Sequence, residues 1–123
     1  MAAIHQRSAA ELSSAYSRGE LSPVEVARAS LERIEAWEPR INAMYRVHRE
    51  AALEQARASE SRWRSRRPLS PLDGVPITLK ENIYTQGDPA PIGTAASSDA
   101  PPQSVDAPAA ARVREAGCVI LGK

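Results

Sequence analysis

The segment Asp73-Gly-Val-Pro-Ile-Thr-Leu-Lys80 marks a change of hydrophobic period along this chain. Its three large aliphatic residues occupy alternate positions, as in a strand that buries one face. Pro76, Thr78 and Lys80 share the opposite face of that strand. Because Asp-Gly is a turn signal, the segment predicts a short strand that is entered through a tight turn and ends at a lysine.

A second strand is predicted near the end of the sequence. Residues 118–121 read Cys-Val-Ile-Leu, a continuous apolar run typical of a strand buried on both faces. Residues 86–104 are rich in Gly, Pro, Ser and Ala and predict a long irregular loop. We expect Asp106 to cap a helix that runs to Val113 and is closed by Gly117. Strand, loop, helix and strand in this order predict a βαβ-like unit.

Helix signals fill the first half of the chain. Ser8 and Glu11 have the spacing of a capping box, and Gly19 can close the helix that they begin. Residues 22–25, Ser-Pro-Val-Glu, are a stronger start signal, and we expect Pro39 to end that second helix.

The rest of the first half carries weaker signals. The second helix has an apolar stripe of Val24, Ala27, Leu31 and Ile34. Residues 41–47 alternate weakly and suggest a strand within a connector, whereas residues 50–66 predict a third helix with a poor apolar face.

These elements predict an α/β fold in which residues 1–67 form a helical segment and residues 68–123 begin an α/β core. Two buried strands cannot provide each other with neighbours on both sides. We therefore expect the N-terminal part of one larger, incomplete domain. The alternative is a chain whose strands are completed by a partner protein.

The composition excludes several classes of function. The 123 residues carry a net charge of +1, so no overall field attracts nucleic acid or an acidic membrane. The single cysteine, Cys118, excludes an internal disulfide and a CxxC metal site. His5 and His48 lack partners at metal-ligand spacing, so we expect no metal. No secretion signal or long apolar run is present, which favours a soluble cytoplasmic protein.

Lys80 is the first candidate for chemistry, because the chain has only two lysines against fourteen arginines. It stands where a strand enters a loop, a common position for functional residues in α/β proteins. If a second layer enclosed its face, its pKa would fall and the amine could act as a base. From the spacing alone, a solvated lysine at a strand end, paired with Glu81, is the interpretation that the sequence favours, because single lysines are mostly surface residues.

The other candidate functional residues have weaker support. Residues 62–67, Arg-Trp-Arg-Ser-Arg-Arg, resemble a phosphate-binding patch, but they also suit the solvated end of a helix. Ser97 and Ser98 lack the surroundings of a hydrolase nucleophile. Gly87 and Gly93 fit no phosphate-binding loop.

Residues 68–83, Pro-Leu-Ser-Pro-Leu-Asp-Gly-Val-Pro-Ile-Thr-Leu-Lys-Glu-Asn-Ile, resemble the segment that presents the catalytic lysine in the amidase signature family. The flanking phrases agree in order and spacing. Residues 19–26 read Gly-Glu-Leu-Ser-Pro-Val-Glu-Val, and residues 116–123 read Ala-Gly-Cys-Val-Ile-Leu-Gly-Lys. The resemblance covers nearly the whole chain.

The resemblance implies a mixed sheet sandwiched by helices and the cleavage of carboxamides, with ammonia transferred to a tRNA-bound substrate in some members. It also implies a Ser-cisSer-Lys triad in which Lys80 is the lysine, with no cofactor. A neutral Lys80 would accept a proton from the bridging serine, which deprotonates the nucleophilic serine.

The chain departs from the family pattern in one respect. The Gly/Ser-rich signature that supplies both serines follows the closing Leu-Gly-Lys, beyond residue 123. We therefore expect a truncated amidase-type hydrolase that is inactive alone, with a small-molecule amide as the substrate of the complete enzyme. A non-catalytic interaction module completed by a partner chain is the alternative.

Overall fold

Capping signals set the ends of the N-terminal helices. The computed structural model describes residues 2–123. A 3-10 turn, η1 (Ile4–Gln6), precedes α1 (Ala9–Arg18), α2 (Pro23–Ile41) and α3 (Arg49–Arg64). Ser8 and Ser22 each accept a hydrogen bond from the glutamate amide three residues on, and each glutamate side chain binds the serine amide in return. Both predicted capping boxes are confirmed, as is Gly19, which closes α1 with φ 70°.

The prediction that Pro39 ends α2 is wrong, because the helix continues to Ile41. A proline removes one helical hydrogen bond, but other hydrogen bonds still close the last turn of α2. Asn42 adopts the left-handed conformation, and its amide donates to the Glu38 carbonyl at 2.8 Å. The Glu38 carboxylate also accepts the amides of Ala43 and Met44.

The connector between α2 and α3 does not form the strand suggested by its alternation. Only Val47 makes a bridge, an isolated antiparallel one to Gly122. Tyr45 and Arg46 donate their amides to the Lys123 carbonyl, so backbone pairing rather than side-chain burial holds this segment. The approach is so close that a Cβ at residue 122 would overlap the Arg46 carbonyl.

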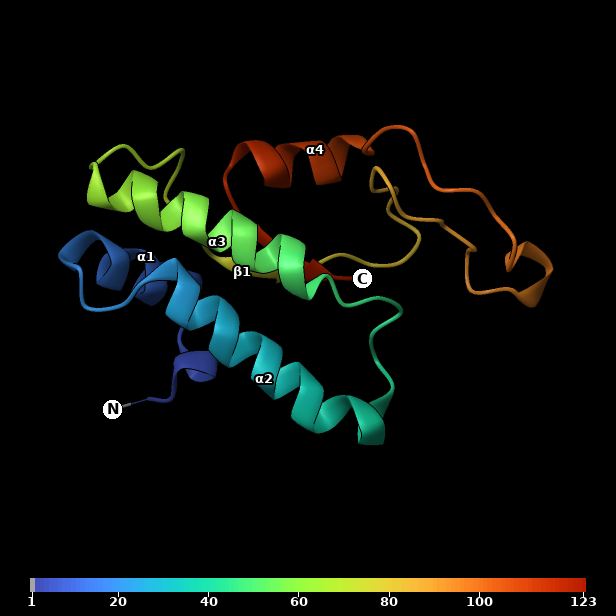
Figure 1. Cartoon of the computed structure of the whole chain (residues 1–123), viewed down its shortest axis with the longest axis horizontal. Coiled ribbons are helices and arrows are strands. Elements are labelled where there is room, and N and C mark those ends of the chain that lie inside the picture. Colours follow the sequence, from blue (N-terminus) through green and yellow to red (C-terminus); the bar gives the residue numbers. More distant parts are fainter. Residues whose placement is uncertain (1) are drawn as a thin grey trace.

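The C-terminal half forms the predicted βαβ unit (Figure 1). β1 (Pro76–Thr78) pairs in parallel with β2 (Val119–Gly122), and the connection contains α4 (Pro108–Glu115). The register pairs Pro76 with Val119 and Thr78 with Gly122, with an irregular step after Ile77. The long predicted loop is confirmed, apart from the 3-10 turn η2 (Ala95–Ser97) and a single bridge between Gln86 and Gln103.

Asp106 does not cap α4 as predicted. The N-cap is Ala107, which makes no side-chain capping bond. The Asp106 carboxylate lies one residue too early and instead accepts the amide of Gln86 and the Nε–H of Arg114. Gly117 closes the helix region with φ 84°, as expected.

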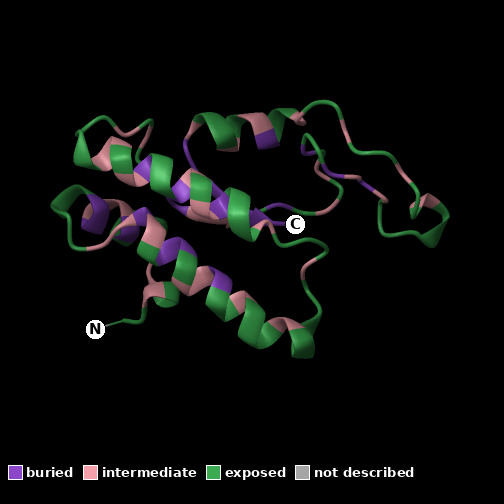
Figure 2. Cartoon of the chain, in the orientation of Figure 1, coloured by how far each residue is buried: buried purple, intermediate pink, exposed green. Residues whose placement is uncertain are grey.

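The sheet lies between two helical layers. Val119 and Leu121 pack against α2 and α3, whereas Ile120 and Leu79 pack against α4. All four residues of β2 are buried, as the apolar run predicted, and Figure 2 shows this buried centre beneath α3. No helix within residues 2–123 is long and apolar enough to cross a membrane.

The predicted stripe of α2 is confirmed. Ala27 and Leu31 are buried, and Val24 and Ile34 pack against them. Val26, outside that stripe, is also buried, in a second cluster with residues of α1.

Candidate functional site

Lys80 lies just beyond the carboxyl end of β1, beside the end of β2. The amide of Leu79 donates to the Gly122 carbonyl at 3.1 Å, which fixes the backbone immediately before the lysine. The amide of Ile83 donates to the Lys80 carbonyl at 3.0 Å and closes a turn immediately after it. The Lys80 side chain is exposed. The sequence indicated a general base only if the Lys80 amine were enclosed and desolvated. Residues 2–123 do not enclose it.

A groove lies against β1, the strand that precedes Lys80. Pro76 and Thr78 line this groove together with residues of η1 and α2, including Arg33 and Ile34. Lys80 itself does not line this groove.

Glu81 does not hold the Lys80 ammonium in an ion pair within the described chain. Its Oε1 accepts the amide of Ile92 at 2.6 Å, so the carboxylate binds the backbone of the long loop instead. The solvated lysine of the alternative interpretation is present, but without its expected partner.

The second lysine has a different environment. Lys123 is only 4% exposed, and its Nζ has no hydrogen-bond partner among residues 2–123. Buried ammonium groups are normally paired, because an unpaired one costs several kcal/mol. Apart from the rarity of lysine in this chain, no sequence signal pointed to this burial.

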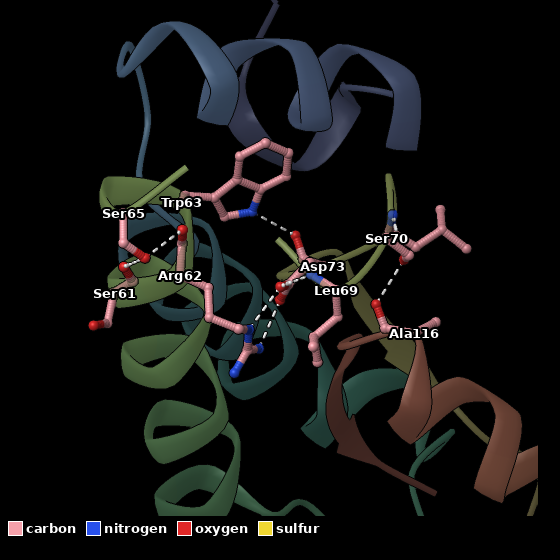
Figure 3. A network of polar contacts seen from close by, with 9 residues as sticks. Ser61, Arg62, Trp63, Ser65, Leu69, Ser70, Asp73 and Ala116 are labelled. Atoms are coloured by element: carbon pink, nitrogen blue, oxygen red, sulfur yellow. Dashed lines mark hydrogen bonds and ion pairs between the residues drawn. The ribbon is translucent and has the colours of Figure 1, made fainter. Parts of the chain in front are cut away.

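A polar network fixes the turn that leads into β1 (Figure 3). The Asp73 side chain is completely buried and accepts both Nε–H and Nη2–H of Arg62 at 2.7 Å. It also accepts the amide of Leu69 at 2.8 Å. Burial acts to raise the pKa of Asp73, but these hydrogen bonds outweigh burial, and the pKa lies below its ordinary value.

Trp63 and Tyr16 complete this network. The indole Nε1–H of Trp63 donates to the Asp73 carbonyl at 2.9 Å, and the Tyr16 hydroxyl donates to the Gly74 carbonyl at 3.0 Å. The two rings pack with centroids 5.9 Å apart. Arg62 and Trp63 therefore bind the chain's own interior, whereas Arg64, Arg66 and Arg67 are exposed, as expected for a solvated helix end.

A histidine–aspartate pair was missed by sequence reasoning. His48 Nε2 lies 3.0 Å from Asp88 Oδ2, which also accepts the Thr85 hydroxyl at 2.8 Å. Asp88 is 6% exposed and lies forty residues further along the chain, so no local pattern relates it to His48. The described residues contain no cluster of His, Cys, Asp and Glu that could hold a metal ion.

The remaining sequence candidates do not join Lys80. Ser97 and Ser98 lie at η2, in the part of the long loop that Figure 1 shows extended away from the sheet. Cys118 is buried, and burial together with the nearby Asp73 charge raises the pKa of its thiol. A raised pKa disfavours the reactive thiolate.

Comparisons with known proteins agree on one family. The family model described as Amidase matches residues 25–123. The glutamyl-tRNA(Gln) amidotransferase A-subunit of Salinispora tropica is 43% identical over 116 residues, which cover 94% of this chain and 23% of the relative. Its counterpart in Chloroflexus aggregans is 39% identical over 123 residues, covering 100% of this chain and 25% of that protein.

Solved structures give the same result. The native peptide amidase from Stenotrophomonas maltophilia superposes with a TM-score of 0.85 at 32% identity, over 96% of this chain and 24% of that one. A chain from a vestigial complex related to the origins of an s-triazine catabolic enzyme gives 0.89 at 28% identity, over 94% and 25%. This chain thus spans about a quarter of the length of the relatives it matches.

Proposed function

This chain belongs to the amidase signature family, and on that premise we propose that it forms the N-terminal part of an enzyme that hydrolyses carbon–nitrogen amide bonds. Its contribution to the reaction is Lys80, the lysine of a Ser-cisSer-Lys triad. Both serines belong to the remaining part of the enzyme, so residues 1–123 alone are inactive. The substrate is a small-molecule amide.

In this reaction Lys80 acts as a proton acceptor. Its neutral Nζ takes the proton of the bridging serine, which takes the proton of the nucleophilic serine. The nucleophilic oxygen then bonds to the amide carbonyl carbon, and the carbon–nitrogen bond breaks as the leaving nitrogen receives a proton. Water cleaves the resulting acyl-enzyme. This chain supplies the first acceptor and holds its backbone in place.

The position of Lys80 is the observation that carries the proposal. The lysine stands at the carboxyl end of a parallel strand, where ligands bind in open α/β sheets. Its neighbour Glu81 accepts the Ile92 amide and makes no ion pair with Lys80 within residues 2–123. The remaining enzyme must cover the exposed Lys80 side chain, and this cover would provide the desolvation that lowers an amine pKa.

Two further observations support one incomplete domain, in which residues 1–67 form a helical segment and residues 68–123 begin the α/β core. The outer edge of β1 has no partner strand within residues 2–123, and Thr78 on that strand is exposed. The buried Lys123 ammonium lacks an acceptor in the same range. Additional polypeptide would satisfy both. The non-catalytic interaction module predicts the same open edge, but it does not require Lys80.

A joined protein tests the proposal. Residues 1–123 replace the matching segment of the Stenotrophomonas maltophilia peptide amidase, and hydrolysis of a peptide amide is followed by chromatography. We expect the isolated chain to be inert and the joined protein to be active. Lys80→Met should lower kcat by about a thousandfold, the size of a lost acid–base contribution.

Glu81→Gln is the matched control, because it alters the adjacent residue and should leave hydrolysis largely intact. Hydrolysis by the isolated chain that depends on Lys80 would contradict the proposed inactivity. A Lys80→Met joined protein as active as its parent would contradict the catalytic role and favour the interaction module.

A further inference from the structure

We propose that the Arg62–Asp73 ion pair is a positioning device that sets the register of β1 on β2 and thereby places Lys80. The pair lies outside the catalytic residues and acts through the strand that carries the lysine. The inference rests on the proposed function only for what Lys80 does, since the register is a property of the fold.

Three consecutive carbonyl groups show how β1 begins. The Asp73 carbonyl accepts from Trp63 of α3, and the Gly74 carbonyl accepts from Tyr16 of α1. The next carbonyl, that of Val75, accepts the Val119 amide at 2.9 Å and begins the ladder with β2. Side chains of α1 and α3 therefore hold the two carbonyl groups that precede the first hydrogen bond between β1 and β2.

The Asp73 carboxylate occupies the junction of the two turns that precede the strands. The amide of Gly74 donates to the Gly117 carbonyl at 2.9 Å, two residues before β2 begins. A Cβ at Gly117 would lie 2.6 Å from Asp73 Oδ1, so the carboxylate contacts the second turn as well. Arg62 thus orients a group that touches the starting points of both strands.

The short ladder needs such a device. β1 has only three residues, and its pairing shifts between Ile77 and Thr78. A three-residue ladder contains few hydrogen bonds to resist a shift, and a slip of one residue moves every side chain of a strand to the other face. Such a slip would also displace the Leu79 amide from the Gly122 carbonyl and with it the backbone that enters Lys80.

The chemistry of the pair fits a positioning role better than a gain in stability. Apolar residues of similar size often stabilise a protein as well as a buried ion pair does. A guanidinium bound through two parallel hydrogen bonds also fixes the orientation of the carboxylate, which a lysine cannot do. The bidentate contact of Arg62 supplies this orientation.

Amide hydrogen exchange of the 123-residue chain tests the register directly. In Arg62→Met we expect the protection of the Leu79 and Val119 amides to fall about a hundredfold, whereas the Leu31 amide within α2 keeps its protection. Arg62→Lys, the milder variant, should give an intermediate and equally local loss. Arg114→Lys is the control, because Arg114 makes an ion pair of the same 2.7 Å length with Asp106.

A uniform loss of protection in Arg62→Lys would overturn the inference, because the pair would then only stabilise the whole fold. No loss at Leu79 would also overturn it, because the pair would then have no effect on β1. In the joined protein, Arg62→Lys should lower kcat about tenfold at unchanged KM, and an unchanged kcat would also overturn it. A parent joined protein without Lys80-dependent hydrolysis would refute the proposed function, whereas the exchange data would still decide the register.

Discussion

At the scale of single residues, the molecule depends on a few buried polar groups that are fully engaged. Asp73 binds a guanidinium and an amide through its carboxylate and an indole through its carbonyl. Lys80, by contrast, is exposed and followed by a carboxylate that binds elsewhere. The groups that hold the site are therefore buried and paired, whereas the proposed reacting group is left accessible.

Asp73 should make stability depend on pH. Its folded pKa lies below its ordinary value of 3.8, so its contribution is complete above that value and is lost as the pH falls through the folded pKa. We expect Asp73→Asn to cost about 3 kcal/mol at pH 7, because it leaves the Arg62 charge without its partner.

This difference between parent and Asp73→Asn should shrink in acid, where the parent carboxyl is protonated. Urea unfolding followed by circular dichroism between pH 2 and pH 7 measures it, with the exposed Asp99→Asn as the control. A difference that is constant over this range would contradict the lowered pKa of Asp73.

Gly122 should tolerate no side chain. A Cβ there would overlap the backbone carbonyl of Arg46, which cannot move without breaking the pairing to Lys123. Gly19→Ala is the control, since Gly19 also has a positive φ but no atom within 4 Å of the position that a Cβ would occupy, and should cost only about 1 kcal/mol. We expect Gly122→Ala to cost several times more in urea unfolding, and equal costs would show that the close approach is unimportant.

At the scale of the elements, local sequence signals predicted the helices and strands well, whereas contacts between distant residues were not predicted. The capping boxes at Ser8 and Ser22 and the alternation of β1 depend on residues within a few positions of one another. The contact between His48 and Asp88 joins segments forty residues apart, and Asp106 exchanged its expected capping role for a contact with Arg114. Pro39 failed as a stop signal because the Glu38 side chain closes the helix two residues later.

The His48–Asp88 contact should hold the long loop against the connector. The Asp88 carbonyl accepts the Gln103 amide, and the Gly87 amide donates to Gln103 in return. We expect His48→Ala to speed hydrogen exchange at Gly87 and Gln103 roughly tenfold, the effect of one lost hydrogen bond to a charged group. His5→Ala, at an exposed 3-10 turn, is the control, and equal exchange in both variants would show that the contact does not restrain the loop.

At the scale of the whole molecule, two helical layers enclose a sheet of two parallel strands whose outer edge is open within residues 2–123. The sequence predicted this α/β organisation from its periodicity, and its resemblance to the amidase signature family is confirmed by the comparisons. The exposure of Lys80 could not be predicted, because the burial of a side chain depends on how distant segments pack around it. The proposed role of the lysine therefore needs a test in a longer protein.

Chemical rescue of Lys80→Ala in the joined protein tests that role most directly. Consumption of a peptide amide is followed by chromatography while ethylamine is added at several pH values. If Lys80 is the proton acceptor, hydrolysis is lost on substitution and returns in proportion to the unprotonated ethylamine. Full hydrolysis without added amine, or a loss that no concentration of unprotonated amine restores, would contradict the assignment of Lys80 as the base.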